Sequence, residues 1–243
     1  MGTRAWAVAG TSGLLLVGSV LGTGSAWGAT TTAPAAPVAV AKGQDYTAML
    51  APVGGNKVTG SGELWVTLTG TKAKFTLQVG GLLDGAPHAS VLYADAKGAC
   101  PTDALASDHS GQRAVTLADA APALGAAGTA LTTSGGTGGD SALALDRYPT
   151  AGAYTYSRTF DIDPKVAAAI ADGTAAMVVH GIDYNGNGAY DGVLGSAAGV
   201  PAEASAPALC GTFVASQMQS VPILILYQSY DKVIMNTRLG KAE

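Results

Sequence analysis

Charged residues, histidines and cysteines are scarce in this chain of 243 residues. Asp, Glu, Lys and Arg together make up 12%, and there are three histidines and two cysteines. The formal net charge is −4 and the basic residues form no cluster, which excludes nucleic acid and anionic membrane surfaces as expected partners. The sequence also contains no G-x-S-x-G elbow and no G-K-S/T phosphate loop. Serine hydrolase chemistry and phosphate binding are therefore not expected.

The first 28 residues have the pattern of a secretory signal peptide. Arg4 precedes an apolar stretch over 5–21, and Ala26-Trp27-Gly28 fits a small-x-small cleavage site. A retained membrane anchor is the alternative, but glycines interrupt the stretch and it is short for a span. Residues 29–42, rich in Pro, Thr and Ala, predict a flexible leader. We therefore expect a secreted protein, extracellular or at the cell surface, with no membrane span in the mature chain.

The two cysteines, Cys100 and Cys210, are predicted to form a disulfide. An even pair in an exported chain favours a bridge, and two buried free thiols are the alternative. No cysteine lies near the cleavage site, so attachment through a lipidated cysteine is excluded. In the chain-entropy model, so long a closed loop would stabilise the fold by roughly 4–5 kcal/mol.

Short runs of alternating apolar and polar residues dominate the sequence after residue 42. With abundant glycine, 34 residues, they predict an all-β protein, a sandwich or barrel with one short connector helix. That helix is expected from Pro164 to Ala171, with Asp163 as its cap and Gly173 after its end. Residues 118–140 read as a long loop. The strands are expected at 46–50, 62–69, 75–79, 89–94, 113–117, 141–145, 153–162, 176–180 and 209–214.

The composition changes near the end of the domain, which we place at 43–216. Beyond it, 221–227 is a continuous apolar run followed by polar residues. Pro222 and the shortness of the run argue against a membrane span. Residues 217–243 are expected to form a C-terminal extension, either one further strand or a disordered tail.

A family resemblance rests on four short motifs taken in order. Gly85-Ala86-Pro87-His88-Ala89 is followed by Cys100-Pro101, then by Val178-Val179-His180-Gly181 and by Cys210-Gly211. Over about residues 45–214 the chain resembles CHRD-type domains, relatives in fold of the copper/zinc superoxide dismutases. The resemblance implies a Greek-key β-sandwich or barrel, with Cys100 and Cys210 in the place of the dismutase disulfide.

The dismutase metal ligands are largely missing from this pattern. The segment that matches the His-x-His pair reads Val91-Leu92-Tyr93. A copper/zinc dismutase needs about six imidazoles and a carboxylate, more than this chain holds. We therefore expect a scaffold without the redox chemistry. The alternative is a degenerate metalloprotein in which His88 and His180 hold a metal.

A zinc site formed by all three histidines is a further alternative. It would bring His109 to His88 and His180, with an oxygen from Asp95, Asp103 or Asp108. No short spacing joins any two of the histidines, so we expect His88 and His180 to be strand-end residues that hydrogen-bond to the backbone.

One loop has the oxygen spacing of a calcium site. Asp183, Asn185, Asn187 and Asp191 occupy the first, third, fifth and ninth positions of a calcium-binding loop, with glycine at the sixth. The twelfth position, where a bidentate Glu is expected, is Leu194. Two carboxylates predict a weak site suited to extracellular calcium, and a tandem Asn-Gly turn without an ion is the alternative. No other cofactor is expected.

The remaining candidate, Glu203, stands alone in a proline-bounded loop and is expected to be solvated rather than a general acid. Together these observations predict a secreted, non-catalytic module with a structural or binding role and an unidentified extracellular or cell-wall partner. The alternatives are a degenerate copper/zinc dismutase-like metalloprotein and a calcium-stabilised adhesion module.

Overall fold

The computed structural model describes residues 43–109, 111–193 and 199–216; the expectations for the signal peptide, the leader and the extension 217–243 lie outside these residues. Within the described chain the protein is mostly β, so the expected fold class is confirmed. The strands are β1 Gln44–Pro52, β2 Ser61–Thr69, β3 Lys72–Gly80, β4 Ser90–Tyr93, β5 Ser107–His109, β6 Gln112–Ala114, β7 Ala127–Ala130, β8 Tyr154–Asp161, β9 Ala176–His180 and β10 Pro207–Ala215.

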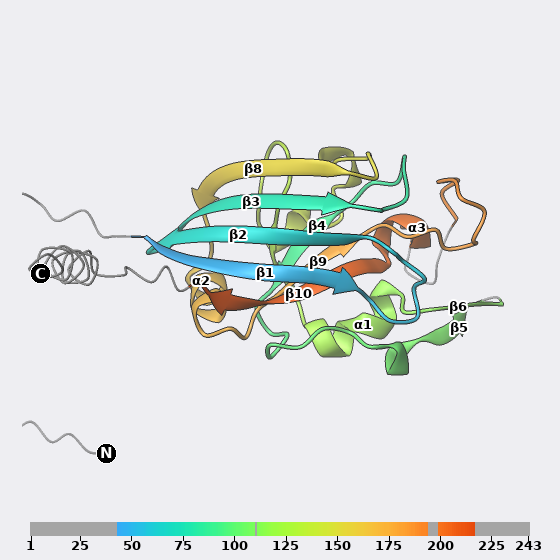
Figure 1. Ribbon diagram of the computed structural model, residues 1–243, viewed down its shortest axis with the longest axis horizontal. Helices are drawn as coiled ribbons and strands as arrows, with labels where there is room; N and C mark the ends of the chain where they lie inside the picture. The colour runs from blue at the N-terminus through green and yellow to red at the C-terminus, as the bar shows by residue number, and fades with distance from the viewer. Residues whose placement is uncertain (1–42, 110, 194–198, 217–243) are drawn as a thin grey trace, which may run out of the picture. The chain divides into compact units, whose positions relative to one another are not determined.

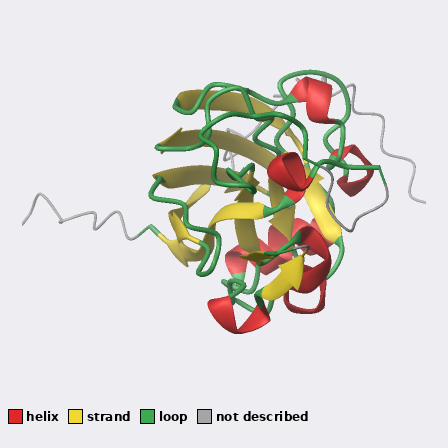
Figure 2. Ribbon diagram, turned by 90° about the vertical axis from the view of Figure 1, so that its right-hand side faces the viewer, coloured by secondary structure: helices red, strands yellow, loops and turns green. Residues whose placement is uncertain are grey.

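Eight of these strands form one antiparallel sheet in the order β7-β4-β9-β10-β1-β2-β3-β8, and β5 pairs with β6 separately. The sheet curls into a half-barrel (Figure 1). Figure 2 shows the strands curving together, with helices and long loops around them. In the part of the chain that the structure describes, no helix is long and apolar enough to cross a membrane.

The β1-β2-β3 meander forms because its apolar residues alternate. Val66 pairs with Phe75 and Leu64 pairs with Leu77, and all four side chains are buried. Except for Trp65, their outward neighbours are polar, so one face of the hairpin packs in the core and the other meets water. Gly70, with φ of +62°, supplies the left-handed residue of the turn between β2 and β3.

The strands β4, β9 and β10 are buried on both faces, which is why β9 is apolar without alternation up to His180. All five residues of β9 are buried. Met177 and Val179 pack in the main core inside the curl, whereas Val178 packs in a second core with Val91 and Cys210. Because this second core covers that face of β9, His180 is buried and not exposed to solvent.

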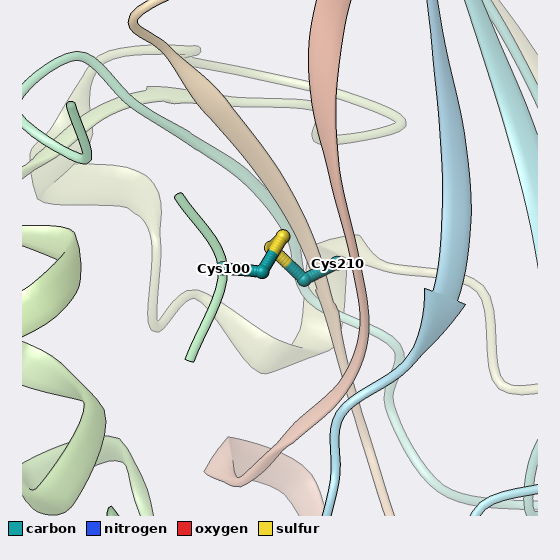
Figure 3. Close-up of a disulfide and its surroundings, with 2 residues drawn as sticks. All are labelled: Cys100 and Cys210. Atoms are coloured by element: carbon teal, nitrogen blue, oxygen red, sulfur yellow. A yellow bond between two sulfur atoms is a disulfide. The ribbon is translucent and has the colours of Figure 1, made fainter. Parts of the chain in front are cut away.

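The predicted disulfide joins the loop after β4 to the middle of β10. Cys100 and Cys210 are bonded, with their Cα atoms 5.8 Å apart (Figure 3). Cys210 is buried in the second core, and Cys100 packs at its edge. The bridge therefore holds the long segment after β4 against the sheet.

The predicted connector helix is confirmed as α2, Pro164–Ala171. The Asp163 side chain accepts a hydrogen bond from Lys165 N at 2.7 Å, and Pro164 occupies the first helical position. Val166 and Ile170, one turn apart, are buried in the main core.

The expectation of a single helix is wrong. The range 118–140, expected to be a loop, contains most of α1, Leu117–Leu124, and β7; a third helix, α3, spans Ala202–Ser205. Thr116 and Asp119 form a reciprocal capping box that starts α1. The prediction of a strand at 141–145 is also wrong, because this stretch runs from the end of the 3-10 helix Gly139–Ser141 to the start of the 3-10 helix Leu145–Arg147.

Candidate functional site

His180 ends β9 and faces two polar partners. Its Nδ1 lies 2.7 Å from the carbonyl oxygen of Ser205, and its Nε2 lies 3.3 Å from the Tyr93 hydroxyl. Because a carbonyl only accepts, Nδ1 carries the proton and Nε2 accepts from Tyr93. Burial lowers the pKa of His180 to about 4, against the raising effect of the Ser205 carbonyl. The ring is therefore neutral at neutral pH.

His88 is fully buried between two backbone carbonyls. Its Nδ1 lies 3.0 Å from the oxygen of His180, and its Nε2 lies 3.0 Å from the oxygen of Leu83. Burial lowers the pKa of His88, against the raising effects of these carbonyls and of Asp84. A neutral imidazole has one N–H and can donate to only one of the two carbonyls. Gly181 is required beside it, since a Cβ at this position would clash with the His88 Nδ1.

A half-open cavity of about 330 Å³ lies next to His180. Its wall is mostly apolar, and its polar lining residues are Tyr93, Asp140, His180 and Ser205. Burial raises the pKa of Tyr93 far above its usual value, so the phenol stays protonated. A cavity of this size with few polar groups can take a small, largely apolar molecule.

The third histidine, His109, takes part in a separate polar cluster. Its Nε2 lies 2.7 Å from Asp119 Oδ2 and 2.8 Å from Ser107 Oγ, and Ser107 donates to Asp119 Oδ1 at 2.8 Å. A catalytic triad requires the serine and the carboxylate on opposite ring nitrogens. Here both lie at the same nitrogen, so the cluster connects the β5–β6 ribbon to α1 and does not activate Ser107.

The three histidines do not form a shared metal site. Among the described residues, no group of three His, Cys, Asp or Glu side chains is placed to hold a metal ion. A zinc site of His88, His109 and His180 with Asp95, Asp103 or Asp108 is therefore not formed in this structure.

Substituting Asp119→Asn is expected to lower the free energy of unfolding by about 2 kcal/mol at neutral pH. Burial raises the pKa of Asp119, but hydrogen bonds from Thr116, Ser107 and His109 outweigh it and lower the pKa to about 2. A lowered pKa gives stability that is fully present above about pH 4 and is lost as the pH falls through 2. Urea unfolding at neutral pH measures the loss, with Asp146→Asn, an exposed Asp, as the control. Equal stabilities of the two variants would contradict the prediction.

The four predicted calcium-loop residues lie together after β9. Asp183 accepts hydrogen bonds from the amides of Gly186, Asn187 and Gly188 at 2.8–3.1 Å. The Asn185 and Asn187 side-chain amides both donate to the Asp191 carboxylate, at 2.9–3.3 Å. The Asn185 and Asn187 side-chain oxygens accept from the amides of Asn187 and Ala189 at 3.1 and 2.8 Å, so the side chains of the loop are bonded within the loop itself.

Glu203 is not the solvated residue that the sequence suggests. It lies in α3, its side chain contacts the end of this loop, and its exposed fraction is 0%. Its Oε2 accepts from the amides of Asp191, Gly192 and Val193 at 2.8–3.2 Å. Its Oε1 is buried with no hydrogen-bond partner. Burial raises the pKa of Glu203, the three amides lower it, and the neighbouring Asp191 charge raises it.

Sequence reasoning missed Glu203, Tyr93 and the cavity because each depends on contacts between distant segments. Ala202 N bonds to Val193 O at 2.7 Å and Ile182 N bonds to Glu203 O at 2.8 Å, so α3 joins both ends of the loop. Nothing in the local sequence around Glu203 signals this pairing. The two prolines that bound the segment indicate a loop, and a loop residue is usually exposed.

No known protein-family model matches the chain, and no curated protein matches it either.

Proposed function

We propose that this chain is an exported, non-catalytic β-module with a structural or binding role at the cell surface or outside the cell. The observation that carries the proposal is the state of His88 and His180. Each ring nitrogen of both residues lies within 3.3 Å of a polar group of the chain itself. The Tyr93 hydroxyl occupies the acceptor nitrogen of His180, and backbone carbonyl groups cover both nitrogens of His88. Both rings therefore serve the fold, and neither has a nitrogen open to a redox metal.

Four further features support the proposal. The N-terminal 28 residues have the signal-peptide pattern, and the disulfide suits an oxidising compartment. The resemblance to CHRD-type, dismutase-like domains supports a scaffold on which the ligand histidines are replaced by residues such as Val91. If the module binds a partner, the cavity beside His180 could hold a small apolar group of an extracellular or cell-wall partner.

Metal analysis of the secreted protein tests the proposal against the degenerate-metalloprotein alternative. The oxidised protein is dialysed against copper and zinc, then against buffer, and its metal content is measured. We expect well below one equivalent of either metal, with no change in His180→Gln or in the control His109→Gln. One equivalent of copper or zinc that is lost in His180→Gln alone would overturn the non-catalytic proposal.

A further inference from the structure

We propose that the apolar run 221–227 packs on the outer face of the sheet, over Met49, Val214 and the partly exposed Trp65. We refer to these three side chains as the outer patch. Its occupant is a segment of this same chain, so the inference concerns an intramolecular contact. It does not depend on the non-catalytic role proposed above.

The outer patch is an apolar area on the otherwise polar side of the sheet. Thr47 on β1 pairs with Trp65 on β2 and with Val214 on β10, so these side chains share the outer face. Met49 lies two residues further along β1 and therefore points the same way. The exposed fraction is 67% for Met49 and 61% for Val214. Large apolar side chains that are exposed as diagonal neighbours, rather than singly, indicate a contact surface.

The described chain ends beside this patch. Ser216, its last residue, donates from its backbone N to the Asp45 carbonyl oxygen at 2.8 Å. Ser216 and Trp65 also line one open groove of about 410 Å³ on the outer face. The four residues 217–220 can span at most about 14 Å when fully extended. Because Ser216 and Trp65 line the same groove, this length is enough to bring Val221 to the outer patch.

The sheet gives the chain after β10 a face to lie on and no edge to extend. The strand β10 already pairs with β1 on one side and with β9 on the other, so no free edge lies beside it. The run 221–227, VPILILY, has no charged or amide side chain, and removal from water stabilises such side chains. A short tether raises the effective concentration of the run at the patch to the millimolar range. Even a weak contact between them is then populated.

The experiment measures the accessibility of Trp65 in the full secreted protein. Trp6 and Trp27 lie in the predicted signal peptide, so Trp65 is the only tryptophan of the mature chain. Acrylamide quenching of its fluorescence is compared between the parent and Leu224→Asp/Ile225→Asp, whose adjacent charges disrupt the run whichever side faces the sheet. We expect the quenching constant to rise roughly twofold and the emission to move to longer wavelength, because the indole exchanges apolar cover for water.

Matched controls and a second variant assign both sides of the contact. Val233→Asp/Ile234→Asp places the same two charges later in the extension and should be quenched as the parent is. Val214→Lys changes the patch and leaves the run intact, and we expect the same rise in quenching. Its control is Leu143→Lys, which alters an exposed apolar residue outside the outer patch. Val214→Lys decides the contact if the first variant does not fold.

Two results would overturn the proposal. Equal quenching of Trp65 in the parent and in the folded variants would mean that the run does not cover the outer patch. A parent that is dimeric by light scattering, and in which quenching rises on dilution, would assign the patch to the run of a second copy. Metal analysis for copper and zinc is unaffected by either result, so this proposal and the non-catalytic role fail separately.

Discussion

Removing the Cys100–Cys210 disulfide is expected to lower the free energy of unfolding by about 4–5 kcal/mol. The bond joins residues 110 positions apart, and the chain-entropy model gives long closed loops the largest effect on the unfolded state. Most single substitutions cost far less, so this change should be among the largest that the fold can show.

The position of the bond gives a second reason to expect a large effect. Between the two cysteines the chain contains α1, the β5–β6 ribbon, β7, β8, α2, β9 and α3. The loop that carries Cys100 lies over the second core, where Cys210 is buried beside Val178. Loss of the bond frees this segment in the unfolded chain and also weakens its attachment to the sheet.

The measurement compares the parent with the variant Cys100→Ala/Cys210→Ala in urea unfolding at neutral pH. Alanine is used because a serine hydroxyl at the buried position 210 would need a hydrogen-bond partner. Adding a thiol reductant should destabilise the parent to the level of the variant and leave the variant unchanged. A difference below about 1 kcal/mol would mean that the bond contributes little beyond local packing.

The sequence predicted the fold best where local pattern and tertiary environment agree. The strands β2 and β3 alternate because one face is buried, and α2 carries its cap, Asp163, and its Pro164 within the helix start itself. The disulfide could be predicted because the sequence contains only two cysteines, which allow only one pairing. In each case the information lies within a few residues or in a simple count.

The predictions that failed concern segments whose local sequence pattern is weak because their residues are small, or whose structure depends on contacts with distant residues. The helix α1 contains Pro122, which is unfavourable inside a helix, and its small alanine side chains leave no clear apolar periodicity. Its capping box at Thr116 and Asp119 was the available signal. The burial of Glu203 depends on amides of 191–193, ten or more residues earlier. The sequence pattern identified the residues of the candidate calcium loop, but it did not predict the contact of Glu203 with the end of that loop.

Lowering the pH from 6.5 to 4 is expected to reduce the stability of the protein by about 3 kcal/mol through His180 alone. Burial lowers the pKa of His180 from 6.5 to about 4, so the unfolded chain binds a proton in this range before the folded chain does. A lowered pKa gives stability that is fully present above pH 6.5 and is lost as the pH falls through 4. The physical reason is that protonation would give Nε2 a hydrogen beside the Tyr93 hydroxyl and leave a charge in the second core.

Two other buried groups have shifted pKa values, and their effects must be separated from that of His180. Burial lowers the pKa of His88, which adds to the loss, whereas burial raises the pKa of Glu203, which opposes it because the folded chain then takes up the proton first. Urea unfolding of the parent and of His180→Gln is measured at several pH values between 7 and 4. The difference between the two proteins in the slope of the free energy of unfolding against pH isolates the contribution of His180. Glutamine can still donate to the Ser205 carbonyl, and it does not titrate. If both proteins lose stability equally between pH 6.5 and 4, His180 is not the group whose burial makes this fold sensitive to acid.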